Sequence, residues 1–352
     1  MVMNTYIVRN NSCGSGKNAG AKAPNDINTI CQELGWHKFA MKMASRGMKK
    51  IFYSVLCTPF QWMELGRLSK GYVLYQYPTY GSTKIASIMI PIIQKIFGSK
   101  IIVLIHDLES LRYHKSNREV QLIDSCSYVI CHNHRMKDYL ISKGVSSVKI
   151  VELGVFDYLC EKTQKIQNNP IKNSVAIAGN LSPDKCRYIY KFVENNPALK
   201  IDLYGVGYEK KAEYSNAEYH GSFSPEELPI RIDSAYGLVW DGPEIASCSG
   251  NYGEYLKYNN PHKFSLYMAA GIPVITWKQA AIADFVKKYQ VGIVVDSLIN
   301  LSDTLNQISD EQYITMKTNA ETIGTKLKEG FYLKKALQAI FDIDALKTRR
   351  GL

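Results

Sequence analysis

The sequence lacks the features of a secreted, disulfide-bonded or membrane-spanning protein. Its eight cysteines are scattered through 352 residues without a Cys-x-x-Cys pair, which favours reduced thiols over a disulfide framework. No charged segment followed by an apolar run opens the chain, so we expect no signal peptide. The most apolar stretch, Ile85 to Phe97, is interrupted by polar residues and is shorter than the roughly 20 residues needed to cross a bilayer. We therefore expect a cytoplasmic location.

Acidic residues are scarce in the first half of the chain. Residues 1–150 hold 20 Lys and Arg against 8 Asp and Glu, a net charge of +12, whereas residues 151–352 hold 23 against 24, a net charge of −1. This distribution excludes a uniformly basic protein of the histone kind and indicates one domain that faces an anionic surface. The basic residues do not interleave with aromatic residues as in nucleic-acid-binding modules, so we expect no nucleic-acid partner.

Strand-like runs rich in β-branched and aromatic residues alternate with helical patterns along the chain. This alternation predicts an α/β fold with parallel strands joined by right-handed crossovers. The expected strands are Thr5–Val8, Tyr72–Gln76, Ile101–Ile105, Tyr128–Cys131, Lys149–Leu153, Ser174–Ala178, Ile201–Tyr204, Gly237–Trp240, Val274–Thr276 and Gly292–Val295. The expected helices are Ile27–Leu34, Met48–Glu64, Thr83–Phe97, Arg118–Cys126, Met136–Lys143 and the amphipathic tail Phe331–Leu346.

The polar segment 160–173, which carries Pro170, interrupts this pattern and is typical of an interdomain linker. We therefore predict two doubly wound domains of the Rossmann kind, residues 1–160 and 161–330. The tail, residues 331–352, forms a separate C-terminal helix.

Three patterns are similar to known sites without satisfying them. The glycine-rich segment Asn10–Gly20 lacks the residues of a Walker A loop, and Pro24 delays the helix that a dinucleotide fingerprint needs. We expect a flexible active-site loop there. Asp342-Ile343-Asp344 is formally a D-x-D motif, but it lies at the end of the terminal helix. Four further candidates have a spacing that matches no standard zinc site, namely Cys126, Cys131, His132 and His134. We predict no bound metal.

A polar pair follows one of the buried strands. His106 and Asp107 come directly after the apolar run Ile101–Ile105, and loops after parallel strands are where catalytic groups usually lie. Two interpretations remain open: a catalytic pair, or a helix-capping Asp107 beside a His106 that is hydrogen-bonded to a loop.

The most informative segment is Gly250–Ile275. Asn260-Pro261-His262-Lys263 leads into a helix that ends at Gly271, after which a strand begins. Amides at a helix N-terminus and the ammonium of Lys263 both favour a phosphate, so we predict an anion site. The alternative is an ordinary helix whose lysine is solvated.

Other strand ends are expected on the same face of the second domain. The loops there carry small or polar residues, and their glycines allow the backbone to approach a base or a ribose. The residues are Asn180, Lys185, Tyr204, Gly205, Gly207 and Asp241.

These segments resemble a family of sugar-nucleotide glycosyltransferases with the GT-B fold. The resemblance is to bacterial β-1,6-galactofuranosyltransferases of O-antigen and capsule synthesis, and more distantly to a streptococcal adhesin glucosyltransferase. It runs almost the full length of the chain, and its most specific phrase is G-x-Y-L-K-x-N-N-P-H-K. The segments that carry it are Asn18–Ala23, Leu104–Glu109, Ala178–Cys186, Leu203–Tyr208, Gly237–Gly242, Cys248–Tyr267 and Ala281–Phe285.

The resemblance implies UDP-sugar binding by the C-terminal domain. Lys263 and the amides of Asn260–His262 would hold the diphosphate, with Lys185 as a second cation. Asn180, Tyr204, Gly205 and Gly207 would frame the uracil and the ribose. No cofactor and no catalytic metal are implied, since UDP-sugar is the donor substrate.

The resemblance also implies acceptor binding by the N-terminal domain, with Gly20, Lys22 and Tyr77 near the acceptor. The C-terminal helix would cross back to this domain. Transfer from a UDP-α-furanose to a β-linkage inverts the anomeric carbon and needs a base. Asp107 is our first candidate, with His106 beside it and Asp241 less favoured.

We therefore expect an inverting transferase that moves galactofuranose from UDP-galactofuranose to a sugar hydroxyl. The alternatives are a transferase of UDP-glucose or another UDP-hexose, and a non-catalytic sugar-nucleotide-binding subunit. The acceptor is expected on a lipid diphosphate, and a homo-oligomer is possible. A basic helix with Lys42, Arg46, Lys49 and Lys50 and apolar Ile51, Phe52, Val55 and Leu56 would be drawn to anionic lipid at the inner membrane face. A solvated basic face is the alternative.

Overall fold

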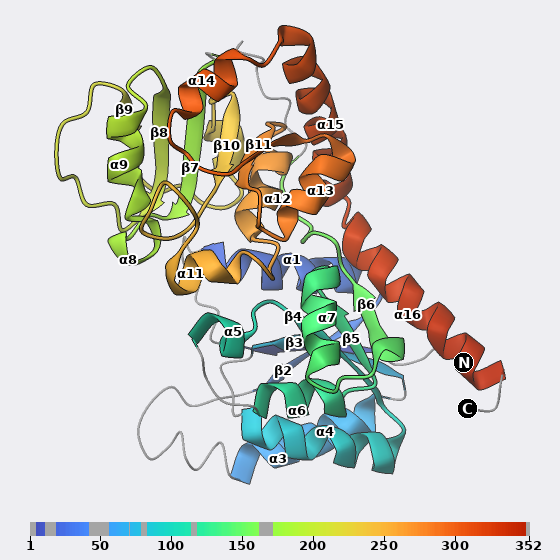
Figure 1. Cartoon of the computed structure of the whole chain (residues 1–352). Coiled ribbons are helices and arrows are strands. Elements are labelled where there is room, and N and C mark those ends of the chain that lie inside the picture. The colour runs from blue at the N-terminus through green and yellow to red at the C-terminus, as the bar shows by residue number, and fades with distance from the viewer. Residues whose placement is uncertain are drawn as a thin grey trace. The chain divides into compact units, whose positions relative to one another are not determined.

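The chain forms two compact units, each built around a parallel β-sheet (Figure 1). A computed structural model describes residues 5–10, 19–41, 56–69, 71–78, 83–113, 118–161 and 172–349. The N-terminal unit comprises Met1–Gly16, Pro24–Leu153 and Leu333–Leu352, and the C-terminal unit comprises Lys17–Ala23 and Gly154–Tyr332. The predicted α/β class with two parallel sheets is confirmed.

The sheet of the N-terminal unit has the strand order β2-β1-β3-β4-β5-β6, with every pairing parallel. All side chains of β3 are buried, and so are those of β4 after its first residue. Such apolar runs are typical of strands covered by helices on both faces. The strands are β1 (Tyr6–Asn10), β2 (His37–Met41), β3 (Tyr72–Tyr77), β4 (Lys100–Ile105), β5 (Tyr128–Cys131) and β6 (Ile150–Glu152). The helices are α1 (Ala19–Glu33), α3 (Thr58–Leu68), α4 (Thr83–Phe97), α5 (Glu109–Tyr113), α6 (Arg118–Ser125), α7 (His134–Ser142) and the 3-10 helix η2 (Ser147–Lys149).

The sheet of the C-terminal unit has the order β12-β11-β10-β7-β8-β9, again parallel throughout. The chain moves outward from β7 in one direction and then restarts beside it with β10. The strand order therefore reverses between β7 and β10, the place where doubly wound sheets bind ligands. The strands are β7 (Ser174–Asn180), β8 (Lys200–Val206), β9 (Ala217–Tyr219), β10 (Tyr236–Val239), β11 (Val274–Trp277) and β12 (Gly292–Val295). The helices are α8 (Pro183–Cys186), α9 (Tyr188–Asn195), α10 (Leu228–Arg231), α11 (Gly250–Tyr255), α12 (His262–Ala269), α13 (Ile282–Tyr289), α14 (Leu301–Asn306) and α15 (Asp310–Lys328).

The last helix, α16 (Phe331–Arg349), belongs from Leu333 onward to the N-terminal unit. The Asp344 carboxylate accepts hydrogen bonds from the hydroxyls of Tyr72 at 2.5 Å and Tyr128 at 2.7 Å. The ammonium of Lys100 forms an ion pair with the same carboxylate. These three partners begin β3, β5 and β4, so Asp344 anchors the helix at the amino ends of the strands. The second aspartate of the D-x-D pattern is therefore a packing residue.

Three features differ from the predicted elements. The edge strands β2 and β9 were not expected. Helix α1 begins at Ala19 and contains Pro24, which the sequence led us to treat as a delay of the helix. Of the helix expected over Met48–Glu64, the second part falls in α3 (Thr58–Leu68). Residues 42–55 with their basic side chains, the glycine-rich residues 11–18 and most of the linker lie outside the described residues. No described helix is long and apolar enough to cross a membrane.

Candidate functional site

Two lysines and an aspartate meet where the strand order of the C-terminal sheet reverses. Asp241 follows β10, Lys185 lies in α8 just after β7, and Lys263 is the second residue of α12. The Lys263 ammonium lies 2.8 Å from Asp241 Oδ1 and 3.1 Å from the carbonyl oxygen of Trp240. The Lys185 ammonium lies 3.8 Å from Asp241 Oδ2. Lys185 and Lys263, both expected at the donor site, thus meet at Asp241, which was expected as a less favoured candidate for the base.

Burial makes this cluster electrostatically strong. The side chain of Lys263 is 10% exposed and that of Asp241 is 7% exposed. Burial alone would lower the pKa of the Lys263 ammonium, but the adjacent Asp241 carboxylate raises it above its ordinary value. With two ammonium groups and one carboxylate, the cluster carries a net charge of +1, a suitable environment for a phosphate. Because Asp241 is engaged by two lysines, it is placed to orient them, which does not favour the role of base.

The N-terminus of α12 presents backbone amides and no capping side chain. His262 does not offer its imidazole there: the ring is stacked on Tyr158 with centroids 5.1 Å apart. Burial, with a smaller contribution from the charge of Lys22, lowers the pKa of His262 to about 4, so the ring is neutral. Asn260 donates a hydrogen bond from its side-chain amide to the carbonyl of Gly154. The expected contribution of Asn260 and His262 to a diphosphate site is therefore limited to backbone groups.

Two glycines at the end of β8 are required by its close packing against the end of β7 and the turn that follows β7. Gly205 has φ +143°, and a Cβ added there would lie 1.8 Å from the carbonyl oxygen of Gly179. Gly207 has φ +78°, and its Cβ would contact Ser182 and Asn180 at 3.2–3.3 Å. Their packing function is therefore independent of any ligand.

Asn180 and Tyr204 have structural partners of their own. The exposed Asn180 accepts a hydrogen bond from the backbone amide of Ser182 at 3.0 Å and shapes the turn into α8. Tyr204 is buried and stacked on His220 at 4.7 Å. The ring of Tyr204 thus lies in the interior. The resemblance had implied that this ring contacts the nucleoside.

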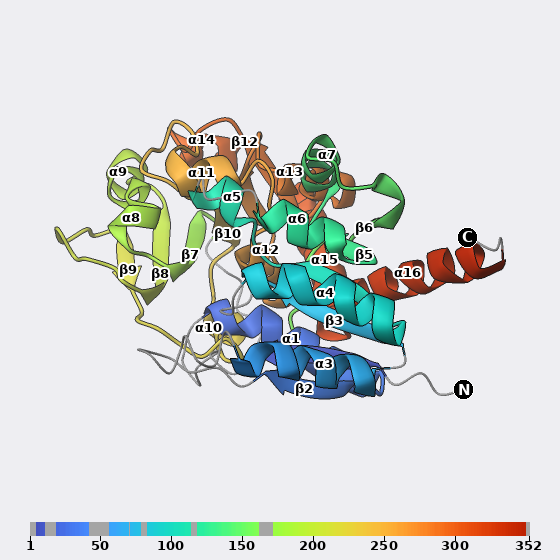
Figure 2. The same ribbon diagram turned by 90° about the horizontal axis from the view of Figure 1, so that it is seen from below.

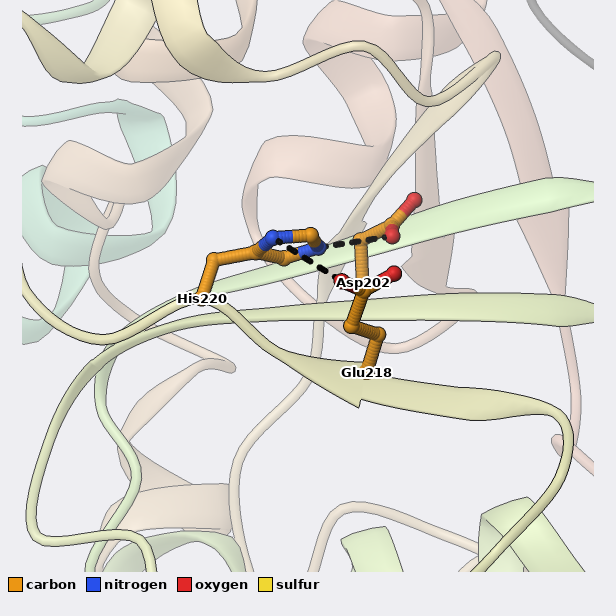
Figure 3. Close-up of side chains that lie close together, drawn as sticks. All are labelled: Asp202, Glu218 and His220. Carbon is orange, nitrogen blue, oxygen red and sulfur yellow. Dashed lines mark hydrogen bonds and ion pairs between the residues drawn. The ribbon is translucent and has the colours of Figure 1, made fainter.

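Among the described residues, a single group of at least three metal-ligating side chains comes together: Asp202, Glu218 and His220 (Figure 3). The two carboxylates lie at opposite nitrogens of the imidazole, Asp202 2.9 Å from Nε2 and Glu218 3.9 Å from Nδ1. Asp202 also accepts a hydrogen bond from Ser234 at 2.7 Å and lies 3.4 Å from the Lys200 ammonium. The cluster is thus explained by hydrogen bonds to Asp202 and by the ion pair between Asp202 and Lys200.

In the N-terminal unit, a buried amide network orients His106. The Gln76 amide nitrogen donates to Asn28 Oδ1 at 3.1 Å, so its carbonyl oxygen faces His106 Nε2 at 2.7 Å. Nε2 is then the protonated ring nitrogen, and the basic lone pair lies on Nδ1. Sequence reasoning missed Gln76 and Asn28. A signal existed for Gln76, since it is the one amide in the otherwise hydrophobic and aromatic run YVLYQY.

Asp107 and Tyr77 have partners within the same unit. Asp107 Oδ2 accepts a hydrogen bond from the guanidinium of Arg112 at 2.9 Å. The Tyr77 side chain, expected near the acceptor, is 1% exposed and donates to Glu119 at 3.1 Å. Glu119 also accepts the backbone amide of Glu109 at 2.6 Å, which ties the start of α5 behind the His106–Asp107 loop. Tyr77 is therefore placed in the interior.

Lys22 belongs to the C-terminal unit. The sequence had led us to expect it in the N-terminal domain, near the acceptor. Its ammonium donates to the carbonyl of Leu159, lies 3.3 Å from Glu226 and stands 5.0 Å from the ring centroid of Tyr158. With 5% exposure, it acts as an internal cation. Gly20 is the second residue of α1.

Two family models match the chain. The glucosyltransferase 3-like N-terminal domain matches residues 4–155, and the glucosyltransferase 3-like C-terminal domain matches residues 175–340. The chain is 37% identical over 259 residues to the β-1,6-galactofuranosyltransferase WbbI of Escherichia coli K12, covering 72% of this chain and 74% of the relative. It is 26% identical to glucosyltransferase 3 of Streptococcus gordonii, covering 92% of this chain and 94% of the relative.

Solved structures share the fold at low sequence identity. Anabaena HepE in complex with UDP has a TM-score of 0.62 at 12% identity, with 97% of this chain and 100% of that chain covered. Sucrose-phosphate synthase from Thermosynechococcus elongatus has a TM-score of 0.63 at 12% identity, with 98% and 99% covered. These likenesses show a GT-B fold.

Proposed function

This chain belongs to the glucosyltransferase 3-like family and is a GT-B glycosyltransferase, and from this premise we propose that it transfers galactofuranose from UDP-galactofuranose to a saccharide hydroxyl. The observation that carries the proposal is the 37% identity to a relative named as a β-1,6-galactofuranosyltransferase. The lysine cluster after β7 and β10 supports a nucleoside diphosphate as the leaving group. We propose further that the product has a β-1,6 linkage. We also propose that the acceptor is carried on a lipid diphosphate, as a step in surface polysaccharide synthesis.

UDP-glucose is the alternative donor. The family models and a relative of 26% identity both bear the name of a glucosyltransferase. The buried cluster of Lys263, Asp241 and Lys185 fits the diphosphate of either donor, because both donors carry the same UDP group. Only the sugar distinguishes the two proposals.

Departure of UDP is the step that the lysine cluster would assist. Negative charge grows on the diphosphate as the glycosidic bond breaks, and preorganised donors lower the barrier where that charge develops. Lys263 is held by Asp241 and the carbonyl of Trp240, so its position is fixed before the donor arrives. The lysines and the α12 amides would stabilise this negative charge, so the proposal involves no catalytic metal.

Attack by the acceptor would invert the anomeric carbon and release a proton. The sequence favours Asp107 as base, but its pairing with Arg112 makes His106 the stronger proposal. Gln76 fixes the tautomer with the lone pair on Nδ1, as a base requires. The reaction would form one glycosidic bond, break the bond to UDP and transfer the hydroxyl proton to the enzyme.

The test is release of UDP from UDP-galactofuranose and UDP-glucose, with and without a pyranoside acceptor, followed by NMR of the product. We expect acceptor-dependent turnover of UDP-galactofuranose and a β-anomeric signal. Lys263→Met is expected to lower kcat/KM about 100- to 1,000-fold. Lys172→Met is the control, because Lys172 pairs with Asp310. It precedes the amino end of β7, whereas the lysine cluster lies beyond the carboxyl ends of the strands.

Two further variants address the base. His106→Gln is expected to reduce kcat about 100-fold or more, and Asp107→Asn to reduce it less. The reverse order would return the role to Asp107. Preference for UDP-glucose would overturn the proposed donor, and UDP binding without turnover on either donor would favour a binding subunit.

A further inference from the structure

Two neighbouring helices of the N-terminal unit carry large apolar side chains that face solvent. On α4, Ile88, Ile92 and Ile96 are 53%, 37% and 59% exposed. Their spacing of four residues places them in one row along the helix. On α3 and the turn before it, Phe60 and Leu56 are 75% and 48% exposed. Single exposed hydrophobic residues are ordinary, but a row of three beside two more is a patch.

The two helices form one continuous surface. They lie side by side in both views of the N-terminal unit (Figures 1 and 2). Gly66 of α3 permits this close approach: a Cβ there would lie 2.5 Å from the ring of Phe97 and 3.0 Å from the Cβ of Ile93. The residues that α3 buries include Trp62 and Leu65, and those that α4 buries include Ile90. The exposed apolar residues therefore lie on the outward faces of both helices. We call them the α3–α4 face, defined by Leu56, Phe60, Ile88, Ile92 and Ile96.

The exposed charged side chains on the two helices are mainly basic. Glu64 of α3, one turn after Phe60, is the one exposed acidic residue on these two helices. Arg67 on α3 and Lys84 and Lys95 on α4 are exposed beside the apolar row. An apolar surface bordered by flexible cations is the arrangement of proteins that lie on anionic bilayers, where the side-chain stems reach down and the ammonium groups meet phosphates.

We propose that the α3–α4 face is a docking surface for an anionic lipid bilayer, with the isoleucine row and Phe60 entering the acyl boundary and the flanking cations contacting headgroup phosphates. Charge complementarity argues for lipid over a second copy of the chain. Two identical faces brought together would oppose cations with cations, which is destabilising. Such attachment needs no membrane-spanning helix, because the side chains of the α3–α4 face reach only the headgroups and the acyl boundary.

Vesicle co-sedimentation of the full chain tests this proposal. The probes are vesicles of phosphatidylethanolamine with phosphatidylglycerol and vesicles of phosphatidylcholine alone. We expect pelleting with the anionic vesicles that weakens as salt is added. Ile88→Ser/Ile92→Ser/Ile96→Ser is expected to reduce the partition coefficient about 10- to 100-fold. Lys84→Gln/Lys95→Gln is expected to reduce it less and to flatten the salt dependence.

The control carries the same change elsewhere. Ile230, Ile299 and Ile314 of the C-terminal unit are 43%, 46% and 61% exposed, so Ile230→Ser/Ile299→Ser/Ile314→Ser removes a matched amount of apolar surface. It is expected to pellet like the unchanged chain, and circular dichroism melting verifies that each variant is folded. Equal pelleting of the α4 triple variant and the unchanged chain would overturn the proposal. So would the absence of pelleting, or a triple variant that dissociates an oligomer in sedimentation velocity, since the face would then join copies of the chain.

Discussion

At the scale of single residues, a glycine near the end of a strand can be required for two reasons, a positive φ or a lack of space for a Cβ. The sequence alone does not distinguish these reasons. Gly205 and Gly221 both have positive φ, +143° and +79°. Only Gly205 also lacks space, because its Cβ would overlap the carbonyl oxygen of Gly179 at 1.8 Å, whereas nothing lies within 4 Å of a Cβ at Gly221. Gly205→Ala must therefore move β8 away from β7, while Gly221→Ala only strains its own backbone.

We expect Gly205→Ala to lower the free energy of unfolding by about 3–5 kcal/mol. Gly221→Ala is the matched control and is expected to cost about 1–2 kcal/mol, the usual penalty of a left-handed conformation. Urea denaturation followed by circular dichroism measures both. Equal losses would contradict the argument, since backbone strain alone would then account for Gly205.

At the scale of elements, α16 is held by a carboxylate that a motif search assigns to another role. Asp344 accepts hydrogen bonds from Tyr72 and Tyr128 and pairs with Lys100. Burial alone would raise the pKa of Asp344, but the hydrogen bonds from Lys100, Tyr72 and Tyr128 lower it below its ordinary value of 3.8. A carboxyl whose pKa is lower in the folded state stabilises that state above its unfolded pKa, and this stabilisation is lost as the pH falls.

Asp344→Ala is expected to cost about 3 kcal/mol at neutral pH, because it leaves two tyrosine hydroxyls and an ammonium without their acceptor. The loss should begin to diminish as the pH falls below about 4, where the carboxyl of the unfolded chain becomes protonated, and should be smallest at still lower pH, where the native carboxylate is protonated too. Thermal melts over a pH series measure it. Asp342→Ala is the control, since Asp342 is exposed and bonded only to Gln338 on the same helix, at 2.9 Å, among the described side chains. A pH-independent loss in Asp344→Ala would rule out the charged carboxylate as the source.

Elements with strong local patterns were predictable, and the exceptions have physical reasons. Apolar runs such as Ile101–Ile105 are strands because both faces of the sheet are covered. The edge strands β2 and β9 escaped prediction: β2 has one buried side chain in five, and β9 has three residues. The positions of His106 and Asp107 after β4 and of Asp241 after β10 were predictable as well.

Contacts between distant segments were not predictable from local sequence. That Asp241 joins Lys263 to Lys185 depends on β10 lying beside β7, which no local sequence pattern specifies. The burial of His262 depends on Tyr158, about a hundred positions earlier. Such contacts are set by topology, so sequence reasoning named the cluster's members without their pairings.

At the scale of the whole molecule, the N-terminal unit is assembled from separated parts of the chain. Its sheet comes from residues before Leu153, but Leu333–Leu352 return to it after the entire C-terminal unit. Leu333, Leu337 and Ile340 of α16 are at most 1% exposed, and burying each such side chain is worth roughly 1.5–3 kcal/mol. The two units should therefore respond differently to loss of the tail, although the tail follows the C-terminal unit in sequence.

Ending the chain after Tyr332 tests this by hydrogen exchange read by mass spectrometry. We expect faster exchange in peptides of β3, β4 and β5, whose first residues contact Asp344, and unchanged protection in β7, β10 and β11. Ending the chain after Lys347 is the control, because it keeps Asp344 and the three buried residues of α16. The physical reason is local: opening free energies follow the contacts that each cooperative unit buries. If protection fell equally in both sheets, α16 would stabilise the molecule as a single cooperative body, and the division into two units would not describe its energetics.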